Sequence, residues 1–402
     1  VPALVHRAHE RAGSPLHGMV TPPPPSAPMR TRVAPARPRT LAPLVLILVA
    51  LALVSGITGG LVRAGVPLPS LFPLSGWAGH AAVAHAGLMI CGFMGTVIGV
   101  ERAVAVKLRA AWLAPLASGV GALCLLVNKT DVGAVLWLAA ALFFTAVNVV
   151  VMHRQRAAHT LLLLGGALAW LIGCVLFLRR PGDAASLPWW FAFLAMTIAA
   201  ERLEMTRLMR RRPGANASLW LLLGLMALGA ALTSFSVRIG GVLYGLSLLL
   251  LALWLGVFDI ARRTVFAHGL ARYMAVCLLG GYAWLAVAGW AWTGTTLGLP
   301  LRDMALHALG LGFIVSMMLG HAPVILPAIA RIKIEFGKFF YLPLVALHLS
   351  LIVRLVWGLD DPHWRATGAL LNTGAMALFA ATMLGGAVLW RVRHARAGND
   401  GE

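Results

Sequence analysis

Five histidines lie within the apolar stretches of the sequence: His80, His85, His307, His321 and His348. A polar side chain inside an apolar membrane segment is costly, so such a residue marks a functional site by default. Imidazole is also the commonest protein ligand of redox metals. These five residues are therefore the candidates for a cofactor or metal site.

His85 and His307 belong to two apolar segments, residues 80–100 and 303–327, that are expected to run in the same direction through a membrane. At about 1.5 Å per residue, both imidazoles lie roughly 6 Å below the same membrane face. Two helices that each offer one imidazole at one depth can hold a haem from its two sides. We therefore predict that His85 and His307 bind haem, with His80 as the reserve ligand.

Arg354 lies among leucines in the apolar segment 339–358, near the end that returns to the same level. A guanidinium in an apolar span costs roughly 2.5–3.5 kcal/mol at mid-bilayer, so an anionic partner is expected. Three partners are considered, in this order: a haem propionate, Asp303, and lipid headgroups reached by snorkelling. On the first interpretation, Arg354 is a further haem-binding residue.

His321 and His348 lie deeper in the predicted membrane segments. His321 shares a helix face with His307, but about 21 Å of helix separates them, so they cannot bind one metal ion. A second metal site formed by His321 and His348 is one interpretation, although their depths differ by roughly 10 Å. The alternative is that both are isolated histidines that form hydrogen bonds within the protein.

Three glutamates lie near segment ends, and two of them directly precede an arginine: Glu101 before Arg102, Glu201 before Arg202, and Glu204 in the same segment as Glu201. Ion pairing at the ends of membrane helices is the simpler interpretation of these pairs. A path for proton entry from the cytoplasm is the alternative.

The elements that must position these residues are membrane helices. Of the 402 residues, 60% are hydrophobic and only 11% are charged, and the mean hydropathy is +0.85. A soluble domain carries about 25% charged residues, so an ordinary soluble fold is excluded. In such a chain the net charge of +20 indicates basic cytoplasmic loops rather than binding to nucleic acid. The predicted fold class is an all-α polytopic membrane protein.

Twelve apolar segments follow residue 40, each of about the 20 residues that span a bilayer. Most of the 33 Lys and Arg residues fall on one side of these segments, which predicts that both termini are cytoplasmic. The segments are residues 41–64, 80–100, 111–128, 132–152, 158–178, 187–208, 217–235, 239–261, 271–293, 303–327, 339–358 and 366–391.

The predicted organisation has three parts. Residues 1–40 are rich in proline and arginine and are expected to form a disordered cytoplasmic tail. Residues 41–392 form the twelve-helix transmembrane domain, and residues 393–402 form a cytoplasmic C-terminal tail. The expected location is the inner membrane of a bacterium. Four cysteines within apolar segments give no disulfide framework.

Two of the histidine-bearing segments resemble a known family. They read HAGLMICGF over residues 85–93 and HALGLGFIVSMMLG over residues 307–320. A third stretch, around Arg354, reads LIVRL. These stretches are similar to the NnrS family of twelve-span membrane proteins, which resemble the catalytic subunits of haem-copper oxidases. The resemblance implies a bundle of that type, haem and a further copper site, and a role in nitric oxide metabolism or nitrosative-stress tolerance.

Two functions are compatible with these observations. The first is a haem-binding membrane protein for redox or nitric oxide chemistry, with the lipid bilayer, haem and a periplasmic electron donor as partners. The metal-ligand candidates are then His85, His307, His321 and His348. The second is a transporter without a cofactor, in which polar residues near the midplane line a substrate path. Whether the protein is an enzyme is left open.

Overall fold

The structure is a computed structural model that describes residues 41–67, 75–206, 213–330 and 332–399. The predicted tail, residues 1–40, lies outside the described residues. Every regular element in the described ranges is a helix. Eleven helices of this part of the chain are long and apolar enough to cross a membrane. The predicted class, a polytopic helical membrane protein, is thereby confirmed.

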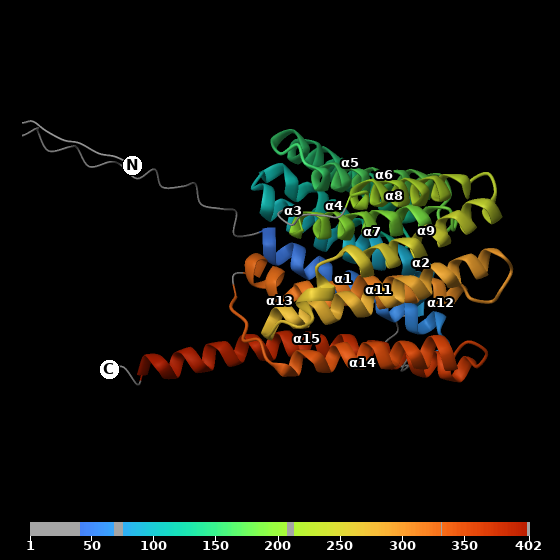
Figure 1. Cartoon of the computed structure of the whole chain (residues 1–402). Helices are drawn as coiled ribbons and strands as arrows, with labels where there is room; N and C mark the ends of the chain where they lie inside the picture. The colour runs from blue at the N-terminus through green and yellow to red at the C-terminus, as the bar shows by residue number, and fades with distance from the viewer. Residues whose placement is uncertain (1–40, 68–74, 207–212, 331, 400–402) are drawn as a thin grey trace, which may run out of the picture. The chain divides into compact units, whose positions relative to one another are not determined.

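The first part of the chain supplies nine helical elements, coloured blue to green in Figure 1. They are α1 (Leu41–Arg63), α2 (Ser75–Gly87), the π-helical η1 (Leu88–Gly95), α3 (Thr96–Val106), the short 3₁₀ turn η2 (Arg109–Trp112), α4 (Leu113–Leu126), α5 (Thr130–Arg154), α6 (Ala158–Arg179) and α7 (Ser186–Met205).

The second part continues from green to red. It contains α8 (Ala215–Leu232), α9 (Val237–Phe258), the short α10 (Ala261–Thr264), α11 (Gly269–Thr296), α12 (Arg302–His307), the π-helical η3 (Ala308–Val315), α13 (Ser316–Ala330), the 3₁₀ turn η4 (Lys338–Phe340), α14 (Tyr341–Ile352), the π-helical η5 (Val353–Trp357) and α15 (Pro362–Asn399). Elements α2, η1 and α3 run end to end, as do α12, η3 and α13, and also α14 and η5. Each predicted segment overlaps one of these long helices.

Helix α7 differs from the other long helices. It corresponds to the predicted segment 187–208, but it is not among the eleven that are apolar enough to cross a membrane, and it carries Glu201, Arg202 and Glu204 near its C-terminal end. Residues 190–200 are all buried. Its main neighbour is α6, and it also contacts α8, η1 and η3. Because protein surrounds α7, this helix does not need a surface apolar enough to face lipid.

Small residues allow the long helices to approach one another closely. A Cβ at Gly289 of α11 would lie 2.6 Å from the Gly245 carbonyl oxygen of α9. Large aromatic side chains fill the wider spaces, and the rings of Trp170 and Phe193 stack with their centres 5.0 Å apart. Close backbone approach at small residues is the usual way in which membrane helices pack.

The start of α15 has a clear local cause. Pro362 occupies its first position, where no backbone N–H is needed, and Asp361 Oδ1 accepts a hydrogen bond from the His363 backbone N–H at 2.8 Å. The helix then continues to Asn399, so the predicted C-terminal tail, residues 393–402, begins as helix rather than as a separate segment. Arg393 donates to Glu335 at 2.7 Å, which holds this part of the helix.

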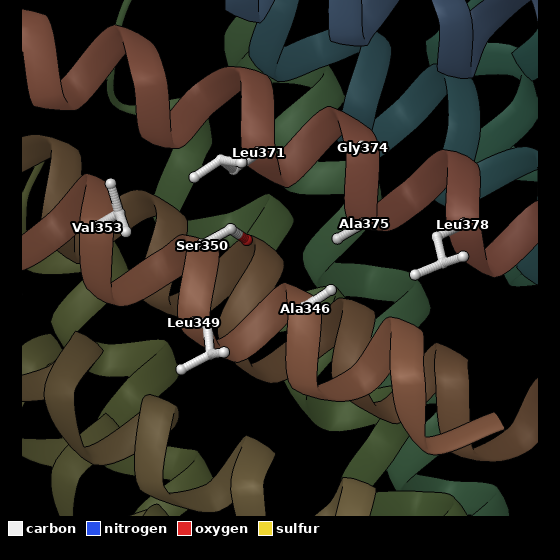
Figure 2. A pocket seen from close by; sticks show the side chains of 8 residues that line it. All are labelled: Ala346, Leu349, Ser350, Val353, Leu371, Gly374, Ala375 and Leu378. Carbon is white, nitrogen blue, oxygen red and sulfur yellow. The ribbon is translucent and has the colours of Figure 1, made fainter. Parts of the chain in front are cut away.

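Helices α14 and α15 lie side by side (Figure 1). Between them is a pocket of about 290 Å³, shown in Figure 2. None of the five candidate histidines lines this pocket, and Ser350 is its one polar lining residue. The pocket is therefore distinct from the histidine site described next.

Candidate functional site

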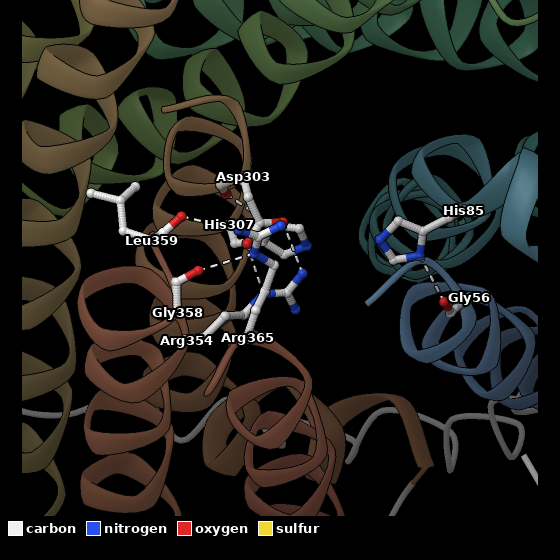
Figure 3. A network of polar contacts seen from close by, with 8 residues as sticks. All are labelled: Gly56, His85, Asp303, His307, Arg354, Gly358, Leu359 and Arg365. Carbon is white, nitrogen blue, oxygen red and sulfur yellow. Dashed lines mark hydrogen bonds and ion pairs between the residues drawn. The ribbon is translucent and has the colours of Figure 1, made fainter. Parts of the chain in front are cut away.

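The imidazole rings of His85 and His307 face one another (Figure 3). Their centres are 6.1 Å apart and their planes differ by 23°. His85 lies in the last turn of α2, and His307 is the last residue of α12. The structure thus brings together the two residues that the sequence placed at one depth.

The Nδ1 atom of each histidine forms a hydrogen bond with a backbone carbonyl oxygen. His85 Nδ1 lies 2.7 Å from the Gly56 carbonyl oxygen, and His307 Nδ1 lies 3.0 Å from the Asp303 carbonyl oxygen. A carbonyl oxygen only accepts, so each Nδ1 must carry the hydrogen and each Nε2 keeps its lone pair. Neither Nε2 has a hydrogen bond within the described residues. Metal-bound histidines have this same arrangement.

Helix α1 leaves space for the His85 ring at one glycine. A Cβ at Gly60 would lie 2.8 Å from His85 Cε1 and 3.2 Å from His85 Nδ1. Any larger residue at this position would push the ring away from the Gly56 carbonyl. The backbone of α1 therefore sets both the hydrogen bond and the direction of the His85 ring.

Arg354 forms a two-point ion pair with Asp303. Arg354 Nε donates to Asp303 Oδ2 at 3.0 Å, and Nη2 donates to Oδ1 at 3.0 Å. Only 7% of the Arg354 side chain is exposed, which leaves it out of reach of lipid headgroups. Of the three partners considered for Arg354, the structure shows Asp303 and not lipid headgroups reached by snorkelling. The Nη1 group forms no hydrogen bond in the described residues and can still meet a propionate.

The position of Arg354 depends on α15. A Cβ at Gly368 of α15 would lie 2.5 Å from the Arg354 Cα, so the two backbones touch. Arg365 donates through Nε to the Gly358 carbonyl and through Nη2 to the Leu359 carbonyl, both at 3.0 Å. These bonds tie the end of η5 to α15, as Figure 3 shows. The sequence pattern did not indicate this role for Arg365.

The three π-helical segments of the described residues adjoin the site. Segment η1 begins three residues after His85, η3 directly follows His307, and η5 contains Arg354. A π-helical turn inserted in an α-helix is uncommon and is often found at functional sites. Hydropathy and glycine spacing gave no signal of these segments, because both patterns are the same in α- and π-helical stretches.

His80 has a different environment from His85. Its Nδ1 lies 3.1 Å from the Leu126 carbonyl oxygen at the end of α4. It thus contacts α4, whereas His85 faces His307. His80 therefore stays the reserve ligand.

His321 and His348 each have hydrogen-bond partners within the protein. His321 Nδ1 lies 2.7 Å from the Met317 carbonyl oxygen, and Arg202 Nη2 lies 2.6 Å from His321 Nε2. Trp284 Nε1 donates to His348 Nδ1 at 2.7 Å. In this arrangement His321 has no free lone pair, and His348 Nε2 must carry the ring hydrogen. These contacts match the alternative of isolated, hydrogen-bonded histidines.

The described residues offer a pair of imidazoles and no multi-ligand metal centre. No group of three or more His, Cys, Asp or Glu side chains that could hold a metal ion occurs in the described part of the chain. Haem iron needs only axial protein ligands. Two imidazoles on one metal, each with a metal–nitrogen bond of about 2 Å, have ring centres about 6 Å apart. The spacing of His85 and His307 agrees with this value.

Comparison with known proteins gives one match. No curated protein and no solved structure matches the chain. Residues 41–388 match the DUF8744 family, described as a domain of unknown function. The match covers the whole described bundle except the end of α15, so the chain belongs to the DUF8744 family.

Proposed function

We propose that this protein is a haem-binding membrane protein in which His85 and His307 would hold the haem iron. The observation that carries the proposal is the facing pair of rings, with centres 6.1 Å apart. Each ring has its Nδ1–H directed at a carbonyl oxygen. Two imidazoles that direct unused Nε2 lone pairs toward one another, inside an apolar bundle, are suited to bind one iron from both sides.

The other residues of the site hold and tune this pair. The Asp303 carboxylate lies 3.0 Å from Arg354 Nη2 and 3.0 Å from His307 Nδ1, whose N–H it shares with the Asp303 backbone carbonyl. A carboxylate beside a ring nitrogen orients the ring and increases its basicity. Arg354 balances the charge of the Asp303 carboxylate, and its Nη1 group, which forms no hydrogen bond within the described residues, would hold a haem propionate. Haem held in this way supplies one-electron transfer. Redox chemistry of nitric oxide, with electrons from a periplasmic donor, is the reaction that the NnrS resemblance suggests.

We further propose that the chain crosses the inner membrane of a bacterium twelve times, with both termini in the cytoplasm. Eleven helices of the described residues are long and apolar enough to cross by themselves, and α7 would be the twelfth. The length of α7, 20 residues, is that of a membrane span. Its charges lie in its last turns, where the twelve-span topology would put the membrane boundary.

Spectroscopy of the purified protein tests the haem proposal. The full chain, produced with haem available, is expected to show a Soret band and split visible bands on reduction, which indicate six-coordinate haem. His85→Ala and His307→Ala should each abolish haem binding or leave a five-coordinate haem. His348→Ala, which removes a histidine outside the pair, is the matched control and should leave the spectrum unchanged.

Three outcomes contradict the proposal in different ways. Normal haem content in both His85→Ala and His307→Ala would assign the ligands elsewhere. Bound copper in a protein that shows no Soret band would indicate a single ion between the two rings, if His85→Ala and His307→Ala each lose that copper. Neither metal nor haem would favour the alternative function, a transporter whose polar residues line a substrate path.

A further inference from the structure

The connection between α13 and α14 crosses the C-terminal half of α15 (Figure 1). The Glu335 backbone N–H donates to the Gly386 carbonyl oxygen at 2.9 Å, and a Cβ at Gly386 would lie 2.8 Å from Ile334 Cγ2. The 3₁₀ turn η4 also contacts α15. The crossing therefore lies where the candidate span Lys338–Trp357 begins and close to where the candidate span Pro362–His394 ends.

Basic side chains gather at this crossing. The four exposed ones, which we call the basic crossing, are Lys333, Lys338, Arg391 and Arg393. Lys333 Nζ lies over the Trp390 ring, 4.8 Å from its centre, in a cation–π contact. Glu335 forms an ion pair with Arg393, and the other three basic residues have no carboxylate within 4.0 Å in the described ranges. Uncompensated positive charge thus lies beside a tryptophan, a residue that is typical of the membrane–water boundary.

The pocket between α14 and α15 lies deeper along the same two helices (Figure 2). Ala346 and Leu378 line one end of it, and Val353 and Leu371 line the other. Along α14 and η5, Ala346 lies roughly 12 Å and Val353 roughly 22 Å from Lys338. The hydrocarbon of one leaflet is about 15 Å thick, half of the bilayer core. An acyl chain whose headgroup lies at the basic crossing therefore ends at the depth of the pocket.

The walls of the pocket suit a hydrocarbon chain and offer little to a polar ligand. Ser350 is the one polar lining residue, and its hydroxyl donates to the Leu347 carbonyl oxygen at 2.8 Å and accepts from Asn372 Nδ2 at 2.7 Å. Leu349, also in the lining, is 57% exposed, so the pocket is open on the side of that residue. An acyl chain would gain dispersion contacts there without displacing either hydrogen bond of Ser350.

We propose that the basic crossing and the pocket together bind one phospholipid with an anionic headgroup. Lys333, Lys338 and Arg391 attract the phosphate, because basic residues at the ends of membrane helices favour anionic lipids. One acyl chain runs along α14 and α15 to the pocket. A free phosphate ion would use only the first half of this site. The inference does not depend on haem binding at His85 and His307.

Native mass spectrometry of the full chain in detergent tests the headgroup. The probes are phosphatidylglycerol and phosphatidylcholine with identical acyl chains, and the wild-type protein should bind phosphatidylglycerol more tightly. Lys333→Gln and Lys338→Gln should each weaken phosphatidylglycerol binding by about fivefold, as expected for one basic residue at an anionic surface, and leave phosphatidylcholine binding unchanged. Arg156→Gln, at an exposed position between α5 and α6, is the matched control and should change neither.

The acyl-chain half of the site is tested at Gly374. This residue lines the pocket, and no atom lies within 4 Å of a Cβ added there, so Gly374→Leu should fill part of the pocket without forcing the helices apart. It should weaken the binding of both lipids. Gly224→Leu on α8, where an added Cβ is equally free of neighbours, is the control. Glycerol phosphate, a headgroup without acyl chains, should not displace the lipid.

The wild-type measurement decides the matter even if the variants fail to fold, since equal binding of the two lipids overturns the inference. Unchanged phosphatidylglycerol binding in both lysine variants, or in Gly374→Leu, overturns it as well. Displacement of the lipid by glycerol phosphate would instead indicate a site for free phosphate. A dimer that persists without lipid and is lost in Gly374→Leu would assign this face to a second copy of the chain. None of these readouts requires haem, so a failure here is distinguishable from failure of the haem proposal.

Discussion

Asp303 connects Arg354 to His307 through a single carboxylate oxygen. Its Oδ1 atom lies 3.0 Å from Arg354 Nη2 and 3.0 Å from His307 Nδ1. A residue of α12, a residue of η5 and the imidazole that faces His85 thus form one hydrogen-bonded unit. The basicity of the His307 ring is therefore linked to an arginine on another helix.

Asp303→Asn tests this link through the bound haem. The amide keeps the shape of the carboxylate but removes its charge, so the His307 ring becomes a weaker electron donor. We expect about 10–100-fold weaker haem affinity and a higher reduction potential in a redox titration. Asp360→Asn, at an exposed position, is the control. An unchanged affinity and potential in Asp303→Asn would show that the carboxylate does not tune His307.

The Arg354–Asp303 pair makes a separate contribution to stability. Arg354→Leu leaves the Asp303 charge without its partner in a largely apolar site, and we expect a loss of about 1–3 kcal/mol. The double variant Arg354→Leu, Asp303→Asn should be less destabilised than Arg354→Leu alone. Equilibrium unfolding in detergent measures both. If the two changes were simply additive, the ion pair would have no energetic coupling.

A second ion pair provides the control for this measurement. Arg393 pairs with Glu335, and 66% of the Arg393 side chain is exposed. Arg393→Gln should therefore change the stability by less than about 1 kcal/mol, as for other exposed ion pairs. An equal loss in Arg393→Gln and Arg354→Leu would show that burial does not distinguish the two pairs.

Gly60→Ala tests how closely α1 holds the His85 ring. The added methyl group would meet the ring at 2.8 Å, so the ring must move and its bond to the Gly56 carbonyl must lengthen. We expect reduced haem content or a mixture of five- and six-coordinate spectra. Gly79→Ala on α2, where no atom lies within 4 Å of the added Cβ, should leave the spectrum unchanged.

The number of membrane crossings is tested at the two ends of α7. Reporters inserted at Gly182, before α7, and at Gly214, after it, should report opposite sides of the membrane. The same side for both positions would mean that α7 does not cross. A reporter after residue 402 should be cytoplasmic, and one within residues 360–363 should be periplasmic.

The sequence predicted the helices well because hydropathy and length determine which segments can span a bilayer. It also placed His85 and His307 at one depth, since depth follows from the number of residues along a helix. The rotation of each helix depends on its neighbours, and no pattern in a single segment encodes it. The contacts of His321 with Arg202, and of His348 with Trp284, therefore became visible only in the structure.

The partner of Arg354 shows a similar limit. Both Asp303 and a haem propionate were consistent with its depth, and only the side-chain geometry shows that Asp303 takes two of its donor groups. The π-helical segments were not predicted because their effect is local. Segments η1 and η3 have 8 residues each and η5 has 5. Each changes the local hydrogen-bond pattern without altering the apolar composition from which the spans were identified.

The burial of α7 has a consequence for how the chain is inserted during synthesis. Glu201, Arg202 and Glu204 lower the mean apolarity of this helix, so it inserts less readily than its neighbours when it emerges alone. Its neighbours α6 and α8 are apolar enough to insert unaided. On the twelve-span topology, α7 enters the bilayer together with them and becomes stable only when η1 and η3 have enclosed it. The most deeply enclosed helix of the bundle is thus among the last to become committed to the membrane.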